Sequence, residues 1–413
     1  MKRRDFLGGI LSLPVLGRGM LSGSALLPGM GNAQVQSEKT LVVIFQRGGC
    51  DGLNTVVPYA EDDYYRLRPD IAIAPPGSGA GRALNLDGFF GLHPAMRGMH
   101  DIYHQGHLAI LPAVHYPNGN RSHFSSQDFI ESGTPGKLRA DGWLNRYLVS
   151  RKLTSELRAV SFGSLMHALK GTKPVATINS LDTPLPGLDD AVLAKMANIY
   201  QQPVNSLLKQ RLLLKKHGTL AIDSMQILDQ YRQMAYTPAN GAVYPDTVYG
   251  RQLRDIARLL KAGAGLEVAA VNIGGWDTHS GQGGTEGTHA NRLSEFSAGI
   301  TALYQDLGAT HMKDVVILSM TEFGRTVKQN ASYGTDHGNA SCWFVIGHQV
   351  NAGIHGNWPG LAPEQLYQER YLAHSVSFTD IFAEIVTSHF NHAEGLAYIL
   401  PGSRYQPVGF LTG

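Results

Sequence analysis

Five short stretches of this sequence are almost entirely apolar and rich in β-branched residues. They are Thr40–Gln46, His107–Val114, Leu266–Ile273, Lys313–Met320 and Ser341–Gly347. A strand that is apolar on both faces is typical of a parallel sheet that helices cover on either side. Segments with helical periodicity lie between these runs, at Leu92–Gln105, Val248–Ala262 and His289–Leu307. The alternation predicts an α/β fold with a doubly wound, mostly parallel sheet flanked by helices.

The sequence after the N-terminal segment is consistent with a single domain over residues 34–413. Residues of about 186–236 have a helical pattern throughout, which predicts a helical insertion over the sheet. The sequence has no internal repeat and no low-complexity linker. Outside the N-terminus it has no run of 18 apolar residues, so we expect no transmembrane span in the body.

The N-terminus has the pattern of a twin-arginine export signal. The chain begins Met1-Lys2-Arg3-Arg4-Asp5-Phe6-Leu7, and a moderately apolar stretch follows to about Met30. Gly31-Asn32-Ala33 then provides a cleavage site of small residues. We therefore predict a signal peptide over residues 1–33, recognition by the twin-arginine export machinery, and a periplasmic or secreted protein. An ordinary basic tail is the alternative.

The charge of the chain argues against nucleic-acid binding, and its cysteine content leaves one disulfide possible. Removing residues 1–33 takes four basic and one acidic residue from totals of 35 and 33, which leaves a net charge of −1. No basic stripe remains, so nucleic-acid binding loses its electrostatic support. An oxidising destination permits a disulfide between Cys50 and Cys342, but the sequence leaves that pairing open.

Acidic and histidine side chains follow several of the predicted strands. In parallel sheets ligands bind at the carboxyl ends of strands, where these loops would meet. So many carboxylates at one sheet edge would repel one another, and a divalent cation is the simplest compensation. A mixed carboxylate and imidazole set suits Zn, Mn or Fe, and carboxylate-rich subsets also accept Mg or Ca. The candidate ligands to one or two such ions are Asp51, Asp277, His279, Glu322, Asp336 and His337.

A candidate nucleophile lies after the second predicted strand. Ser122 precedes a helical pattern and is a plausible N-cap. The same position suits a nucleophile, because a helix N-terminus stabilises an alkoxide and an attached anion. Arg121 could bind an oxyanion with two hydrogen bonds, and His123 or His337 could act as a general acid.

Taken together, these clusters resemble a family of twin-arginine-exported proteins known as domain of unknown function 1501. More broadly, their order is similar to that of the alkaline phosphatase and sulfatase superfamily. The motifs that carry the resemblance are Arg47-Gly48-Gly49-Cys50-Asp51-Gly52-Leu53-Asn54, Arg121-Ser122-His123-Phe124, Gly275-Trp276-Asp277-Thr278-His279, Thr321-Glu322-Phe323-Gly324-Arg325-Thr326 and Gly334-Thr335-Asp336-His337-Gly338.

The resemblance implies an alkaline-phosphatase-like fold and hydrolysis of phosphate or sulfate esters with one or two divalent ions. Ser122 is the position that best matches the superfamily's nucleophile, and Asp51 matches its first acidic ligand. The later ligands would be Asp277, His279, Glu322 and His337, with Asp336 alongside.

The sequence also departs from the superfamily pattern. No Cys or Ser is followed by the x-Pro-x-Arg motif that sulfatases need for formylglycine. Glu322-Phe323 stands where phosphatases of this superfamily usually have Asp-His. One imidazole is then missing, or it comes from His115, His123 or His289, and a single ion becomes plausible.

The working hypothesis is an exported, metal-dependent hydrolase that acts on a small-molecule or polymer ester through Ser122. Two alternatives stay open. One is a metal-binding or ligand-binding periplasmic protein that kept the fold and lost turnover. The other is a metal-dependent oxidoreductase or isomerase that uses the same ligands.

Overall fold

The computed structural model describes residues 39–151, 157–182 and 224–412, together with Lys195 and Asn198. The predicted signal peptide over residues 1–33 lies outside the described residues. Most of the predicted helical insertion at about 186–236 does so too, and within its described part residues 224–233 are helical.

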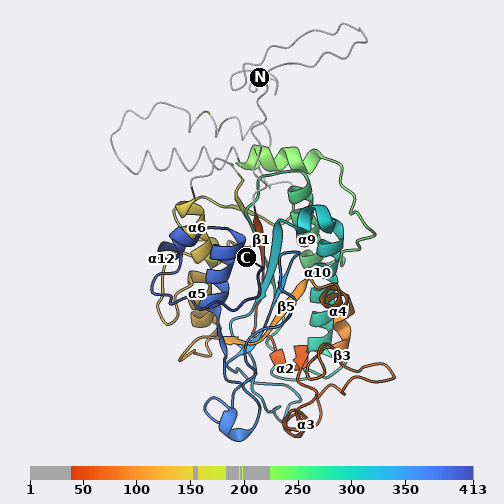
Figure 1. The fold of residues 1–413 in the computed structure, drawn as a ribbon. Helices are drawn as coiled ribbons and strands as arrows, with labels where there is room; N and C mark the ends of the chain where they lie inside the picture. Colours follow the sequence, from red (N-terminus) through yellow and green to blue (C-terminus); the bar gives the residue numbers. More distant parts are fainter. Residues whose placement is uncertain (1–38, 152–156, 183–194, 196–197, 199–223, 413) are drawn as a thin grey trace.

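A large mixed sheet forms the centre of the molecule (Figure 1). Its strands, in spatial order, are β11 (Gly353–Ile354), β5 (Leu108–His115), β10 (Ser341–Ile346), β9 (Val315–Met320), β1 (Thr40–Gln46), β8 (Val268–Ile273), β6 (Ala159–Phe162) and β7 (Ala176–Ile178), and β12 (Val376–Ser377) also pairs with β5. All five strands predicted from the apolar runs are present. The predicted mostly parallel sheet flanked by helices is confirmed.

One strand of the sheet runs against the others. β10 is antiparallel to both of its neighbours, with Phe344 opposite Ser319 of β9 and Ile110 of β5. The apolar sequence of β10 does not show whether the strand runs parallel or antiparallel to its neighbours. A strand buried on both faces has the same apolar pattern in either direction. As a consequence, the loop that leads into β10 lies at the edge where β1, β8 and β9 end.

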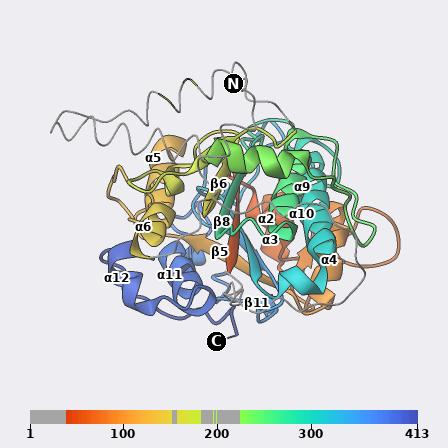
Figure 2. The same ribbon diagram turned by 90° about the horizontal axis from the view of Figure 1, so that it is seen from above.

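Helices cover both faces of the sheet (Figures 1 and 2). One face carries α4 (Arg97–His104), α9 (Val248–Lys261) and α10 (Thr288–Met312), and the other carries α5 (His123–Ser132), α6 (Trp143–Ser150), α11 (Phe378–Glu384) and α12 (Leu396–Ile399). Alternate residues of β1 pack against the helices on opposite faces of the sheet. Val42 and Ile44 lie in the core with α9 and α10, whereas Val43 and Phe45 lie in the core with α6 and α11. No helix among the described residues is long and apolar enough to cross a membrane.

A small second sheet and several short helices complete the fold. A second, small sheet contains β2 (Val56–Val57), β4 (Gly91–Leu92) and β3 (Leu84–Asn85). The short helices are α2 (Gly52–Thr55), α3 (Asp62–Leu67), η1 (Pro94–Met96), η2 (His167–Leu169), η3 (Pro363–Gln365), η4 (Ile385–His389) and η5 (Ala393–Gly395). In Figure 1, α2 and α3 lie at the lower end of the molecule.

Both cysteines are buried and free in the structure, so the disulfide that the sequence left open is absent. Burial raises the pKa of Cys50 to about 12, and it also raises the pKa of Cys342. Thiols in this state are poor nucleophiles, because the thiolate is the reactive form.

Candidate metal centre

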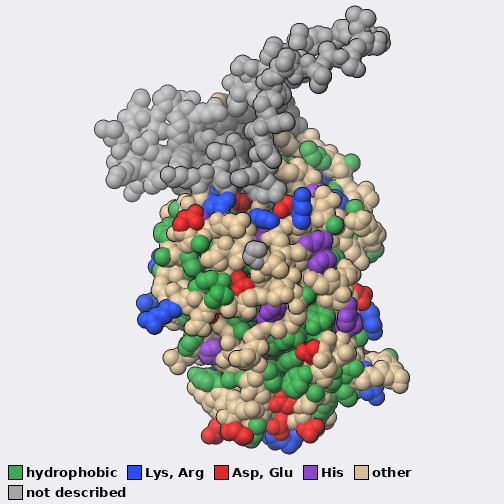
Figure 3. Space-filling view, viewed as in Figure 1, with side chains coloured by type: hydrophobic (Ala, Val, Ile, Leu, Met, Phe, Trp, Pro, Cys, Tyr) green, Lys and Arg blue, Asp and Glu red, His purple; other side chains and the backbone are tan. Residues whose placement is uncertain are grey.

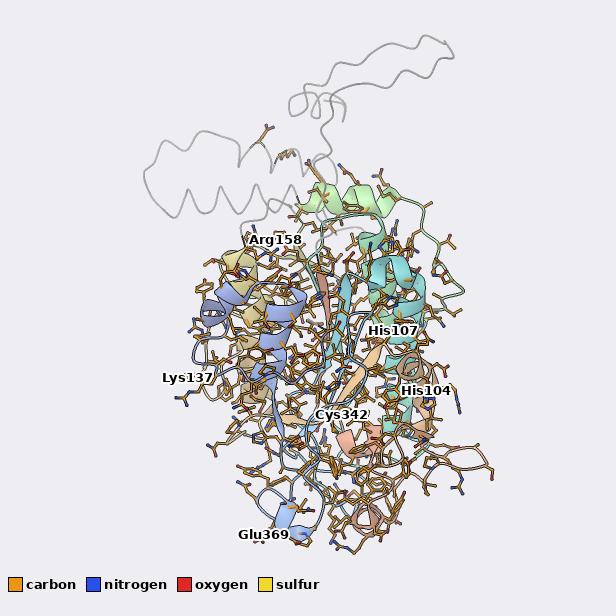
Figure 4. All side chains as sticks on the ribbon, in the orientation of Figure 1. His104, His107, Lys137, Arg158, Cys342 and Glu369 are labelled. Carbon is orange, nitrogen blue, oxygen red and sulfur yellow. The ribbon has the colours of Figure 1, made fainter. Side chains whose placement is uncertain are left out.

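Loops from distant parts of the chain meet at one edge of the large sheet. β1, β8 and β9 end at this edge, and the antiparallel β10 begins there. In Figure 4, Cys342 at the start of β10 and Glu369 in the segment beyond it lie toward this end of the molecule. Ligands of doubly wound sheets bind at the carboxyl ends of strands, so a functional site is expected here.

Two histidines and one aspartate converge in these loops. Nε2 of His123 lies 3.0 Å from Nε2 of His337, and Nε2 of His337 lies 3.1 Å from Oδ1 of Asp277. The second oxygen of Asp277 lies 3.5 Å from Nε2 of His123. Within the described part of the chain, these three residues form the one group whose ligand atoms are all close enough to hold a metal ion. The side chain of Asp277 is 48% exposed, so the cluster is accessible from solvent.

Each member of the cluster comes from a different segment of the chain. His123 is the first residue of α5, Asp277 follows β8, and His337 lies between β9 and β10. Gly48, after β1, packs against the backbone of the β8 loop. A Cβ at Gly48 would lie 2.7 Å from the backbone nitrogen of Asp277, and its φ of 125° is one that other residues rarely adopt.

The hydrogen bonds of the two histidines leave both Nε2 atoms free for a cation. Nδ1 of His123 lies 2.7 Å from Oε1 of Glu322, and Nδ1 of His337 lies 2.9 Å from the carbonyl oxygen of Arg121. Both partners can only accept, so each Nδ1 carries a proton, and in the neutral form of each ring the lone pair lies on Nε2. Two lone pairs facing at 3.0 Å repel unless a proton or a metal ion lies between them. Metal-ligating histidines are usually anchored in this way through their second nitrogen, so the residues fit a metal ion.

A third histidine faces the same aspartate. Nε2 of His279 lies 3.1 Å from Oδ1 of Asp277, and its Nδ1 lies 2.9 Å from Oδ1 of Asp336. His279 therefore repeats the pattern of an anchored Nδ1 and an inward Nε2. Asp336 contacts the ring of His279 and orients it.

Glu322 holds His123 and is surrounded by donors. Its buried carboxylate accepts hydrogen bonds from His123, from Nε2 of Gln127 at 2.8 Å, from the backbone of Gly48 at 2.9 Å and from the hydroxyl of Thr321 at 3.1 Å. Burial alone would raise the pKa of Glu322, but these hydrogen bonds outweigh it and lower the pKa. The structure thus makes Glu322 an anchor for His123, whereas the sequence suggested a direct ligand.

Arg325 ties the loops of the site together. Its buried guanidinium donates to Oδ1 of Asp277 at 2.7 Å. It also donates to the carbonyl oxygens of Gly48, Gly49, Trp276 and Thr335. Burial would raise the pKa of Asp277, but the hydrogen bond and charge of Arg325 outweigh it and lower the pKa to about 2. Asp277 is therefore ionised at any pH at which the protein would function.

Asp51 does not join the cluster. Its carboxylate is buried and pairs with both terminal nitrogens of Arg68, at 2.6 and 2.9 Å, and Nε2 of Gln282 donates to it at 2.5 Å. Burial would raise the pKa of Asp51, but the charge of Arg68 lowers it overall. Asp51, which the sequence suggested as a ligand, thus lies in a buried ion pair with Arg68, outside the group of His123, Asp277 and His337.

Ser122 and Arg121 lie beside the cluster without joining it. Ser122 is exposed at the N-cap of α5, and its side chain makes no capping hydrogen bond. It stands between Arg121, whose carbonyl anchors His337, and His123. The guanidinium of Arg121 donates to Oε1 of Gln368 at 3.3 Å and lies over the ring of Tyr371.

Of the three histidines that could replace the missing imidazole, the structure brings His123 to the cluster. His115 and His289 are buried elsewhere, and burial lowers the pKa of each to about 3. Nε2 of His289 contacts the hydroxyl of Thr55 at 3.1 Å.

Sequence reasoning missed three residues that shape the site. Gln127 lies four residues after His123, so the helical pattern could have placed both on one face of α5. Arg325 lies within the motif Thr321–Thr326, but its many partners come from other loops and leave no local signal. Nothing in the sequence near Arg68 indicates its role, since its partner Asp51 is 17 residues away in a different loop.

Comparisons with known proteins come from sequence families and from solved structures. The family described as "Protein of unknown function (DUF1501)" matches residues 38–406. A search of curated proteins found no match. A protein of the alkaline phosphatase superfamily from Vibrio parahaemolyticus is similar in structure, with 9% identity and a TM-score of 0.38, over 85% of this chain and 66% of that one. The phosphonate monoester hydrolase of Agrobacterium radiobacter is similar with 10% identity and a TM-score of 0.35, over 89% of this chain and 79% of that one.

This chain spans just under two thirds of the length of the Vibrio protein. The family match, in contrast, includes every strand of the sheet and every residue of the candidate metal centre. The chain therefore belongs to the DUF1501 family.

Proposed function

We propose that this protein is an exported, metal-dependent hydrolase of phosphate or sulfate esters. The observation that carries the proposal is the pair of anchored imidazoles, His123 and His337, whose Nε2 atoms face each other at 3.0 Å beside the carboxylate of Asp277. The cluster lies at the edge of the sheet where ligands of such folds bind. An exposed serine hydroxyl immediately precedes one of its members.

His123, His337 and Asp277 would hold the ion, with His279 as a fourth ligand. Imidazole ligands suit Zn and Fe better than Mg or Ca, and a carboxylate ligand also accepts Mn, so we test Zn and Mn. When bound, the ion supplies Lewis-acid charge that lowers the pKa of a nearby hydroxyl and neutralises an ester oxygen. Glu322 and Asp336 would keep His123 and His279 in the productive orientation.

Ser122 would be the nucleophile. Its hydroxyl oxygen would form a bond to the phosphorus or sulfur, and the bond from that atom to the alcohol oxygen of the substrate would break. The proton lost from the serine hydroxyl is balanced by the one that the departing alcohol gains. Water then cleaves the seryl ester, which restores the hydroxyl and releases phosphate or sulfate. The N-terminus of α5, a helix of ten residues, would stabilise the anionic group on Ser122. The contacts of Nε2 of His123 with His337 and Asp277 support a role for His123 as a ligand instead of a general acid.

The proposal is tested with Ser122→Ala and protein loaded with Zn or Mn. We expect the variant to bind the metal as the parent does and to lose turnover of aryl phosphates and aryl sulfates by at least about 1000-fold. Gln105→Ala, at the end of α4, is a surface control that should keep full activity. If Ser122→Ala were as active as the parent, the serine mechanism would be wrong.

Export through the twin-arginine machinery rests on residues 1–33 alone. The test is expression of the full chain in a bacterium with and without that machinery, followed by fractionation. We expect the protein in the periplasm or medium of the strain that has the machinery. The double variant Arg3→Lys with Arg4→Lys should stay in the cytoplasm.

A metal-dependent oxidoreductase is the second candidate. Two histidines and one carboxylate are the ligand set of non-haem iron enzymes, and the cluster of His123, Asp277 and His337 has this composition. Elemental analysis of protein purified from its native compartment separates the two candidates. Iron without any ester turnover would favour the oxidoreductase.

A further inference from the structure

Two arginines lie around one aromatic ring next to the candidate metal centre. The guanidinium carbon of Arg121 is 4.4 Å from the ring centroid of Tyr371, and that of Arg370 is 5.6 Å from the same centroid. Both arginines also contact the residues that hold the cluster. The carbonyl of Arg121 anchors His337, and the guanidinium of Arg370 lies 3.6 Å from Asp336. Two positive charges are thus held at the rim of the site.

The positive charge of Arg121 is not matched by a nearby carboxylate. Among the described residues no Asp or Glu lies within ion-pair distance of it, and its guanidinium donates to the neutral side chain of Gln368 instead. The side chain of Arg370 is 57% exposed and shares Asp336 with His279. A planar guanidinium binds carboxylate, phosphate and sulfate groups with two parallel hydrogen bonds. Both side chains therefore keep capacity for an anion from solvent.

The turn that carries these contacts is strained. Gln368 and Glu369 have φ values of 53° and 56°, which are unfavourable for residues with a side chain. Two backbone hydrogen bonds between Tyr367 and Tyr371, at 2.8 and 3.0 Å, close the turn and maintain this conformation. Strain of this kind is found at ligand-binding positions, where the surrounding structure imposes it. Here the strained residue Gln368 is the one that holds Arg121.

The chain carries little net charge, because its 35 basic and 33 acidic residues give a formal net charge of +2. On the face shown in Figure 3, acidic and basic side chains are interspersed at the lower end of the molecule. General attraction of polyanions by the protein's field is therefore not expected. Recognition of an anion here would depend on the two individual side chains.

We propose that Arg121 and Arg370 bind a second anionic group of the substrate. The substrate would then be an ester whose alcohol part carries a further carboxylate, sulfate or phosphate. This inference rests on the proposed hydrolase function and adds the substrate class to it. It assigns Arg121 to substrate specificity, in place of the oxyanion role that the sequence suggested.

The test compares plain and charged esters on the metal-loaded protein. The probes are phenyl phosphate and phenyl sulfate, each beside its carboxyphenyl counterpart. We expect the carboxyphenyl ester to have a kcat/KM roughly tenfold higher or more, mainly through KM. Arg121→Gln and Arg370→Gln should each reduce this preference, and Arg121→Lys should retain part of it. Arg251→Gln on α9, an exposed arginine paired with Asp246, is the matched control and should keep the full preference.

A second measurement is independent of turnover. Calorimetry would compare the binding of phenylphosphonate and carboxyphenylphosphonate, neither of which can be hydrolysed. Preferential binding of the charged analogue that depends on the two arginines supports the anion site, even if no ester is hydrolysed and the hydrolase proposal fails. Equal affinity for the two analogues, in a protein that does hydrolyse the esters, would overturn the anion site and leave the hydrolase proposal intact.

Discussion

His123 and His337 are 214 residues apart in the chain, yet their Nε2 atoms lie 3.0 Å from each other. Each ring is turned inward by an acceptor on its Nδ1, a carboxylate in one case and a backbone carbonyl in the other. The same arrangement fits a proton or a metal ion between the two rings, since two uncharged imidazoles would otherwise present lone pairs to each other.

Removing one member of this pair should remove the metal. His337→Gln removes the ring nitrogen Nε2 that would bind the metal. We expect the affinity for Zn or Mn to fall by at least about 100-fold. Elemental analysis after dialysis, together with calorimetric titration, measures the effect. His355→Gln, a histidine outside the cluster, should bind the metal as the parent does. Equal metal content in the two variants would show that the ion binds elsewhere.

Glu322→Gln tests the anchor of His123. An amide accepts a weaker hydrogen bond than a carboxylate, so the ring of His123 would be less well oriented and less basic. We expect metal affinity to fall by about 10- to 100-fold while the fold is retained. Circular dichroism and metal titration check both parts. A total loss of metal equal to that of His337→Gln would instead indicate that Glu322 is a direct ligand.

The ion pair between Asp51 and Arg68 should matter for stability and not for metal binding. Arg68→Met leaves a buried, unpaired carboxylate, and we expect it to lower the free energy of unfolding by about 3–5 kcal/mol. The double variant Arg68→Met with Asp51→Leu removes both charges and should recover most of that loss. Urea unfolding measures the stabilities. If the double variant lost its metal while remaining folded, Asp51 would have to be reinstated as a ligand.

Buried neutral histidines predict sensitivity to acid. His115 and His289 have pKa values of about 3 in the folded protein, because burial disfavours the charged ring, whereas the unfolded chain binds these protons near pH 6.5. Their contribution to stability is therefore fully present above pH 6.5 and is lost progressively as the pH falls toward 3. Each group changes the free energy of unfolding by about 1.4 kcal/mol per pH unit within that window.

The measurement is urea unfolding at several pH values between 7 and 4.5. His289→Met cannot titrate and should show a shallower loss of stability with acid than the parent. His355→Gln should follow the parent curve. Parallel curves for His289→Met and the parent would contradict the assignment of His289 as a buried neutral group.

The two cysteines should behave as protected free thiols. Cys50 and Cys342 are both buried, and burial raises the pKa of each. We expect a thiol reagent to label neither residue in the folded protein and both after unfolding in guanidinium without reductant. A protein that yields no thiol in guanidinium would contain the disulfide that the structure lacks.

The sequence by itself determined five strands of the large sheet and the edge at which the site would form. An apolar run such as Thr40–Gln46 is a local property of the chain, so it located β1 without knowledge of its neighbours. The parallel sheet then implied that the loops after β1, β8 and β9 meet. For this reason Asp277 and His337 could be predicted as partners from distant segments.

Only the tertiary structure decided which polar side chain faces which. The direction of β10, the pairing of Asp51 with Arg68, and the choice of His123 over His115 and His289 all depend on contacts between remote residues. A buried charge is neutralised by whichever opposite charge the fold brings within reach, and composition and spacing do not record that choice. Asp51 and Asp277 therefore look alike in the sequence. They differ in the structure because Arg68 and Gln282 bind the buried Asp51, whereas the half-exposed Asp277 contacts Arg325 and also lies within reach of three imidazoles.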